Sequence, residues 1–272
     1  MQTKGVALDM YQSLKCNEAA IELPQNHVHL WLVDQQEVLK NTSLERYSNL
    51  LSHDEHQRMS SFKTPLRRQQ YVITRVALRT ILSLYMPAKS PLDFEFVTNT
   101  YGKPRLVNTP SPLFFNLSHS KHKIVLAFTT SGEVGVDIEY LKLERDVNKI
   151  ANHSFHKHEW CLSQTETQDT RIQQFYKLWA LKEAFIKAQG SGHAIPTNSF
   201  YFTGLDSHEP CIKFDNPSTY EPKKCRFRHS FIVEQYSLAI ALQQAHNPSL
   251  MSVFARNYIP FKSMSSFLPL CS

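Results

Sequence analysis

Hydrophobic and polar residues alternate along two short segments of the chain. His27–Asp34 reads HVHLWLVD and Glu133–Tyr140 reads EVGVDIEY, with valine, leucine or isoleucine at every second position. Because successive side chains of a strand point to opposite faces, this period of two predicts a strand at each place. Within the second strand, Asp137 and Glu139 fall on one face. Two carboxylates that close together resist burial unless a positive group lies beside them.

Two longer segments have the spacing of helices. Apolar residues recur every three to four positions in residues 68–86 and 175–189, and a glycine ends the second segment. The apolar face of the second helix is formed by Phe175, Leu178, Leu181, Phe185 and Ile186. Glu183 and Lys187 lie in a stripe beside this face, whereas Lys182 falls within it. A lysine there is unfavourable unless its ammonium group reaches a polar partner.

The predicted elements occur twice in the same order. The first half contains the segments 27–34, 52–62, 68–86, 93–99 and 113–128, and the second contains 133–140, 156–164, 175–189, 199–204 and 229–242. This repetition suggests two copies of one α+β unit of roughly 100 residues. We predict subdomains at 27–130 and 131–245, an N-terminal extension at 1–26 and a C-terminal tail at 246–272. The tail is apolar enough to pack against the body of the protein.

The composition is that of a globular protein. Of 272 residues, 42% are hydrophobic and 20% are charged, and no apolar run has the roughly 18 residues of a membrane span. The first residues lack the apolar core of a signal peptide, and five scattered cysteines form no CxxC pair. Reduced thiols and a cytoplasmic location are therefore expected. The net charge of +6 and the pI near 9.0 favour binding of polyanions. The seven glycines form no GxGxxG loop or P-loop, which excludes the usual nucleotide-binding loops.

Three carboxylates are candidate metal ligands. Asp137 and Glu139 come from the predicted strand, and Glu183 comes from the predicted helix. An all-oxygen set suits a hard cation, and Mg²⁺ fits best because it connects a few carboxylates to substrate phosphates. Two plainer interpretations stay open. Asp137 and Glu139 also fit a strand edge that meets solvent, and Glu183 with Lys187 fits an i, i+4 ion pair on a helix surface.

Two polar segments of the first half are candidate phosphate contacts. The motif NLSHS (116–120) separates two strand-like runs, so we expect Ser118, His119 and Ser120 to occupy a turn, where hydroxyls, an imidazole and backbone amides suit a phosphate. A polar hairpin tip explains the same residues. The segment YGKPRL (101–106) also reads as a turn, and its basic side chains meet either an anion or solvent.

Taken together, the motifs YGKP, NLSHS, GVDIEY and WALKEAFIKAQGSG resemble the Sfp-type 4'-phosphopantetheinyl transferases in order and spacing, over roughly residues 28–240. The resemblance implies a pseudo-twofold pair of α+β subdomains with the active site in the cleft between them. It also implies a monomer that transfers the 4'-phosphopantetheine arm of coenzyme A to a serine of an acyl or peptidyl carrier protein and releases 3',5'-ADP. Carrier proteins are acidic helical bundles, which suits the positive charge of this chain.

The resemblance also implies roles for single residues. Asp137, Glu139 and Glu183 resemble the ligands of a Mg²⁺ ion that holds the coenzyme A pyrophosphate. Glu183 and Lys187 are the implied catalytic residues, with Glu183 as the candidate base for the serine proton. The implied coenzyme A contacts are Arg58, Gly102, Lys103, Pro104, Ser118, His119, Lys182 and Lys187. One departure is Gln70, which stands where the family often has an arginine; Arg67 and Arg68 lie just upstream.

Other classes of function remain as alternatives. A nucleic-acid-binding protein suits the basic charge, but no RRM-like or zinc-finger motif is present. A zinc site could use His153, His156 and His158, although no fourth ligand is evident. A catalytically silent module that binds carrier protein or coenzyme A is the third alternative. The complete set of acidic residues and Lys187 disfavours this last one, because pure binding does not need them.

Overall fold

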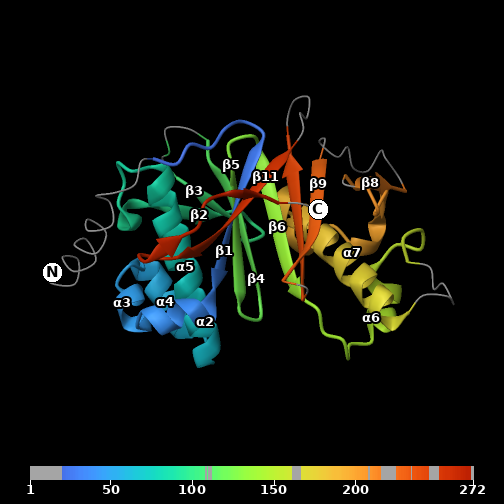
Figure 1. Cartoon of the computed structure of the whole chain (residues 1–272), viewed down its shortest axis with the longest axis horizontal. Coiled ribbons are helices and arrows are strands. Elements are labelled where there is room, and N and C mark those ends of the chain that lie inside the picture. The colour runs from blue at the N-terminus through green and yellow to red at the C-terminus, as the bar shows by residue number, and fades with distance from the viewer. Residues whose placement is uncertain are drawn as a thin grey trace.

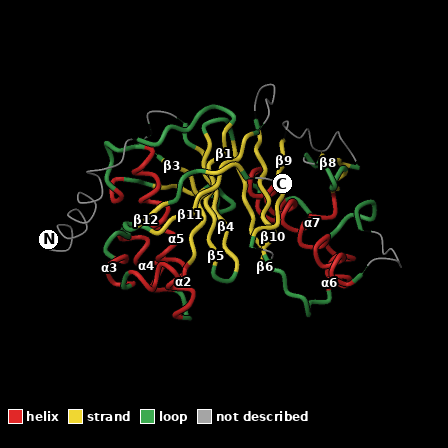
Figure 2. The backbone as a smooth tube through the Cα atoms, viewed as in Figure 1, coloured by secondary structure: helices red, strands yellow, loops and turns green. Residues whose placement is uncertain are grey.

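The computed structural model has helices on both sides of a strand-rich centre (Figure 1). It describes residues 20–107, 109, 112–160, 167–207, 209–215, 225–233, 235–244 and 251–270. Helices α2 to α5 lie on one side of the strands, and α6 and α7 lie on the other (Figure 2). The α+β class predicted from the sequence is confirmed.

The larger sheet belongs mostly to the first half of the chain. Its strands are β1 (His27–Asp34), β4 (Phe114–Ser120), β5 (Lys123–Thr129), β11 (Ser252–Ile259), β12 (Ser263–Met264) and β13 (Leu268–Pro269). The order is β12-β11-β1-β5-β4, and β13 also pairs with β11. The helices of this half are α2 (Gln35–Asn41), α3 (Leu44–Ser48), α4 (His53–Ser61) and α5 (Pro65–Tyr85). A separate hairpin joins β2 (Phe96–Thr98) to β3 (Pro104–Leu106).

The second half contains an antiparallel sheet of order β6-β10-β9. Its strands are β6 (Glu133–Tyr140), β9 (Cys225–Ile232) and β10 (Tyr236–Gln243), and its helices are α6 (Val147–Ser154) and α7 (Gln168–Gln189). A second hairpin is formed by β7 (Phe200–Thr203) and β8 (Cys211–Phe214). Strands β1 and β6 and the long helices therefore lie where the hydrophobic pattern predicted them.

Three hydrophobic cores hold the layers together. The first lies between α5 and the larger sheet, and the second lies between α7 and the smaller sheet. The third joins the two sheets, and its fully buried members include Val28, Leu30, Val125, Val136, Ile138 and Ile240. Full burial of each such side chain contributes about 1.5–3 kcal/mol relative to exposure. The two halves thus pack sheet against sheet, and β4 and β6 meet where the sheets adjoin.

Helix α5 begins three residues before the predicted start at residue 68. Thr64 is its N-cap, because the Thr64 hydroxyl accepts a hydrogen bond from the backbone N–H of Arg67 (3.4 Å). Pro65 occupies the first helical position, where its missing N–H costs nothing. The polar stretch before the apolar pattern therefore belongs to the helix.

Two expectations about local structure need correction or extension. Residues 116–120 do not form a turn: they end β4, and the chain reverses after them at Lys121, which has a φ of 52°. The C-terminal tail packs against the body as expected, but it does so as β11, which runs parallel to β1 from the His27–Ser252 pair onward. Of the N-terminal extension, only residues 20–26 lie among the described residues. No helix in the described segments is both long and apolar enough to span a membrane.

Candidate active site

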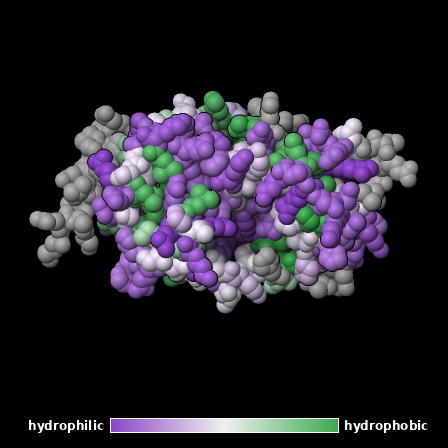
Figure 3. All heavy atoms as spheres, turned by 90° about the horizontal axis from the view of Figure 1, so that it is seen from below, coloured by the Kyte–Doolittle hydropathy of each residue, from purple (hydrophilic) through white to green (hydrophobic). Residues whose placement is uncertain are grey.

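Alternate side chains of β4 hydrogen-bond to β6 and form a seam between the two halves. The Asn116 amide oxygen accepts from the backbone N–H of Val136 (3.0 Å), and the Ser120 hydroxyl accepts from the backbone N–H of Tyr140 (2.9 Å). Ser118 lies between them and also reaches β6. The period of two in NLSHS therefore directs three polar side chains to β6. Seen from below, the middle of the molecule is hydrophilic and hollowed (Figure 3).

Asp137 is the most deeply buried carboxylate of this seam, with 3% of its surface exposed. Its Oδ1 atom accepts hydrogen bonds from the Ser118 hydroxyl (2.9 Å) and the Lys187 ammonium (2.6 Å). Lys187 also donates to Ser118 (2.9 Å). The second oxygen, Oδ2, is buried and has no hydrogen-bond partner. A buried carboxylate oxygen without a partner is energetically costly, so this atom is suited to a cation.

Glu139 lies on the same face of β6 as Asp137. Its Oε2 atom accepts from the Ser120 hydroxyl at 3.3 Å. Burial, and then the negative charge of Asp137, raise the pKa of Glu139 to about 7, although Lys187 and Ser120 act in the opposite direction. Glu139 therefore resists ionisation, first because it is buried and second because Asp137 is charged beside it.

Helix α7 supplies Lys187 and, one turn earlier, the half-buried Glu183. It packs unusually close to β6 at Gly135: a Cβ atom there would lie 2.0 Å from the carbonyl oxygen of Ala184 and 2.4 Å from the backbone nitrogen of Ala188. Only glycine permits this approach. The glycine of GVDIEY thus places the helix and the two carboxylates of β6 next to one another.

The residues fit a divalent cation such as Mg²⁺. The candidate ligands Asp137, Glu139 and Glu183 are all oxygen donors, which hard cations prefer. The buried Oδ2 atom of Asp137 lacks any other partner, and burial together with the charge of Asp137 raises the pKa of Glu139, so a bound cation would stabilise both carboxylates. The ammonium group of Lys187 sits on the edge of this group, since its side chain is 28% exposed.

Basic residues gather near His119, the exposed member of NLSHS. Although His119 is exposed, nearby protein atoms displace part of the water around its ring and lower its pKa, and the positive charges of Lys187 and Arg67 add to this effect. Arg68 is instead engaged with the backbone, because its Nε donates to the carbonyl oxygen of Phe62 (2.8 Å). Arg67, from the first turn of α5, is therefore the arginine that supplements this positive region.

The other predicted coenzyme A contacts are placed less directly. Arg58 is exposed on α4, with its guanidinium 5.2 Å from the ring centre of Phe62. Gly102 turns the chain with a φ of 85° before Pro104. The Lys103 ammonium is buried, and its partners are Glu133 (2.7 Å) and the carbonyl oxygens of Val134 (3.1 Å) and Ala188 (3.0 Å). Its side chain therefore anchors the loop to β6 and α7.

Lys182 lies away from this group, contrary to the expectation that it binds coenzyme A. It is 1% exposed, forms an ion pair with the buried Glu159, and donates to the carbonyl oxygens of Thr197 (2.7 Å) and Phe200 (2.7 Å). These acceptors explain how a lysine can occupy the apolar face of α7. They leave its ammonium no donor for a ligand.

Comparison with known proteins places the chain in a family. The model of the 4'-phosphopantetheinyl transferase superfamily matches residues 133–241. Over 178 residues the chain is 33% identical to the 4'-phosphopantetheinyl transferase HetI of Nostoc sp., covering 64% of this chain and 73% of HetI. The chain belongs to this superfamily.

Two further 4'-phosphopantetheinyl transferases are similar to the chain. It is 33% identical to Sfp of Bacillus subtilis over 184 residues, which cover 59% of this chain and 80% of Sfp. It is 34% identical to gsp of Aneurinibacillus migulanus over 173 residues, which cover 60% of this chain and 70% of gsp. The family resemblance of the four sequence motifs is thereby confirmed.

For a phosphopantetheinyl transferase, sequence reasoning missed two features of the seam. Asn116 was not among the candidate residues, although the alternation of NLSHS places it on the same face as Ser118, and Ser120 was expected to contact a phosphate from a turn rather than to bond to β6. Arg67 was left as one of two alternatives, and only its position near His119 distinguishes it from Arg68.

Proposed function

We propose that the chain transfers the 4'-phosphopantetheine arm of coenzyme A to a serine of an acyl or peptidyl carrier protein and releases 3',5'-ADP. The strongest support is the seam itself: a buried aspartate with a partnerless oxygen, a glutamate of raised pKa and a lysine, all on elements of the family's matched region. Such a set suits the charge of a pyrophosphate held by a metal ion.

Asp137, Glu139 and Glu183 would hold Mg²⁺, which supplies charge neutralisation to the pyrophosphate when bound. Lys187 then exchanges its contact with Asp137 for the pyrophosphate, where an ammonium stabilises the charge that grows on the leaving group. His119 and Arg67 bind the 3'-phosphate, and the backbone of residues 102–104 lines the adenine. Arg58 serves as a more distant positive charge.

The carrier serine provides the nucleophile. Its oxygen forms a bond to the phosphorus that bears the pantetheine arm, and the bond from that phosphorus to the bridging oxygen of 3',5'-ADP breaks. Glu183 accepts the serine proton, directly or through one water. This assignment explains why the chain needs no nucleophile of its own.

The site would lie between subdomains 27–130 and 131–245, because β4 comes from the first and β6 and α7 from the second. A single chain then contains a complete site, and we propose a monomer. The net charge of +6 supports docking of an acidic carrier protein.

Intact-mass spectrometry of an apo acyl carrier protein tests the function directly. The carrier is incubated with the protein, coenzyme A and Mg²⁺, and parallel reactions contain EDTA. We expect a gain of one phosphopantetheine arm, about 340 Da, that is lost in EDTA. Asp137→Ala and Glu183→Gln should abolish the gain while the circular dichroism stays native.

Near-normal turnover of both variants at saturating Mg²⁺ would disprove the metal assignment. If no carrier of the fatty-acid, polyketide or non-ribosomal peptide type gains mass, while coenzyme A still binds, a silent binding module becomes the better account.

A further inference from the structure

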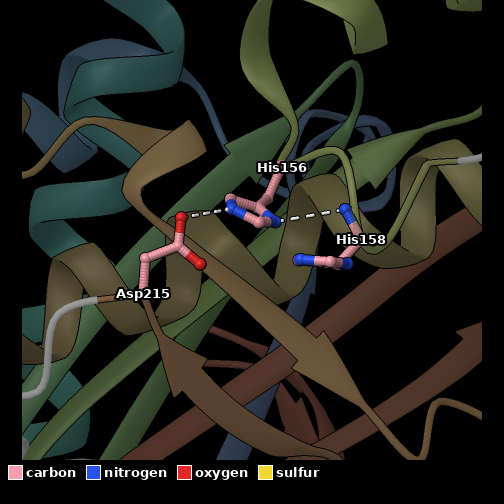
Figure 4. Close-up of side chains that lie close together, drawn as sticks. All are labelled: His156, His158 and Asp215. Carbon is pink, nitrogen blue, oxygen red and sulfur yellow. Dashed lines mark hydrogen bonds and ion pairs between the residues drawn. The ribbon is translucent and has the colours of Figure 1, made fainter.

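Two histidines and an aspartate form a compact group in the second half, and none of them belongs to the proposed magnesium site. His156 and His158 follow α6, and Asp215 follows β8. In the sequence, Asp215 comes 57 residues after His158. One ligand atom from each of the three residues lies within 4.8 Å of the others. Their side chains converge in Figure 4.

His156 is the fixed member of the group, with 5% of its surface exposed. Its backbone N–H donates to Glu159 (3.0 Å), and its ring stacks on Tyr201 with the centroids 4.9 Å apart. Its Nε2 atom lies 2.8 Å from Oδ2 of Asp215, and its Nδ1 atom accepts from the backbone N–H of His158 (3.1 Å). The buried ring therefore directs Nε2 toward the exposed aspartate.

We propose that His156, His158 and Asp215 form a transition-metal site with a preference for Zn²⁺. Imidazole nitrogens with one carboxylate suit Zn²⁺ rather than Mg²⁺, and three protein ligands leave a fourth position for water. In a tetrahedral site with metal–ligand bonds of roughly 2.0–2.1 Å, neighbouring ligand atoms lie about 3.3 Å apart. The contact between His156 and Asp215 thus needs to widen by only about 0.5 Å, starting from 2.8 Å.

The two outer ligands lie at the surface, so this adjustment needs no repacking of the core. His158 is exposed, and the side chain of Asp215 is 59% exposed. Zn²⁺ replaces the Nε2 proton that His156 shares with Asp215, and that proton moves to Nδ1. The backbone N–H of His158 then no longer has Nδ1 of His156 as its acceptor. Because His158 is exposed, this N–H can bond to water instead.

The metal would connect the end of β8 to the segment that follows α6. That segment is coupled to α7, because Glu159 pairs with Lys182 and also accepts from the backbone N–H of Phe202 (2.9 Å). Zn²⁺ would therefore stabilise the fold around α7 without contact to the transferred group.

Zinc binding is measured on the untagged full-length chain after treatment with chelator, by equilibrium dialysis in excess Mg²⁺ at pH 7.5. We expect one Zn²⁺ per chain. His158→Gln and Asp215→Asn should each weaken binding at least tenfold. Zn²⁺ at about 100 times the dissociation constant of the parent protein should raise the melting temperature of the parent by roughly 5 °C or more. At the same Zn²⁺ concentration, the rise in both variants should be about half of this or less.

His153→Gln is the matched control, because His153 is also exposed, lies on α6 and is absent from the group. It should bind Zn²⁺ like the parent protein. All three variants should retain the mass gain of the carrier in Mg²⁺, so this test stands apart from that of the transfer reaction. Absence of zinc binding in the parent protein, or equal binding in His158→Gln and Asp215→Asn, would overturn the proposal.

Discussion

The raised pKa of Glu139 predicts that Glu139→Gln stabilises the metal-free protein in a pH-dependent way. In the folded chain, burial and the charge of Asp137 move the pKa from its ordinary 4.5 to about 7. The stability that the uncharged carboxyl provides is complete below pH 4.5 and is lost as the pH rises through 7. Each pKa unit is worth about 1.4 kcal/mol, so ionised Glu139 destabilises the fold by about 3 kcal/mol at pH 8.

Urea unfolding of both proteins in EDTA, at pH 5 and pH 8, measures this difference. Titrating groups far from position 139 cancel between the two proteins, and only close neighbours such as Asp137 and Lys187 sense the substitution. We expect Glu139→Gln to be more stable by about 3 kcal/mol at pH 8 and by about 1 kcal/mol or less at pH 5. Saturating Mg²⁺ should stabilise the parent protein at pH 8 far more than the variant. A stability difference that does not change with pH would refute the reasoning.

Three further variants test the other assignments. Lys182→Met should lower the free energy of unfolding by about 3–5 kcal/mol because it leaves Glu159 buried and unpaired, and Glu159→Gln in the same chain should recover most of it. The KM for coenzyme A of this double variant should stay near that of the parent protein. A large rise in KM would indicate that Lys182 does contact coenzyme A. His119→Ala should raise the KM for coenzyme A but not for dephospho-coenzyme A, and equal losses with both would contradict the 3'-phosphate contact. Lys187→Ala should lower kcat at least about 100-fold. A kcat like that of the parent protein would contradict the proposal that Lys187 stabilises the leaving group.

Local pattern was enough to predict several parts of this protein. The period of two placed β1 and β6 at their observed ends, and the helical period found α5 and most of α7. The order of four short motifs was enough to indicate the family. These signals are readable because side-chain periodicity depends on residues near one another in the chain.

Pairing between distant segments could not be predicted in this way. β11 has no clear alternation, yet it completes the larger sheet beside β1, more than 200 residues away by their numbers. Its hydrogen bonds come from the backbone, which every sequence shares, so side-chain pattern does not specify the partner strand. Asp215 joins His156 for the same reason: only the folded chain brings them together.

The two lysines of α7 show most clearly what tertiary structure decided. Lys182 and Lys187 are five positions apart, which separates them by about 140° around a helix. The sequence therefore determined that they face different surroundings. Only the packing of α7 determined which surroundings each meets: Lys187 reaches Asp137 at the seam, and Lys182 reaches Glu159 in the core. The charge and the spacing of the two lysines are properties of the local sequence. Their burial and their partners depend on distant segments that only the folded chain brings beside α7.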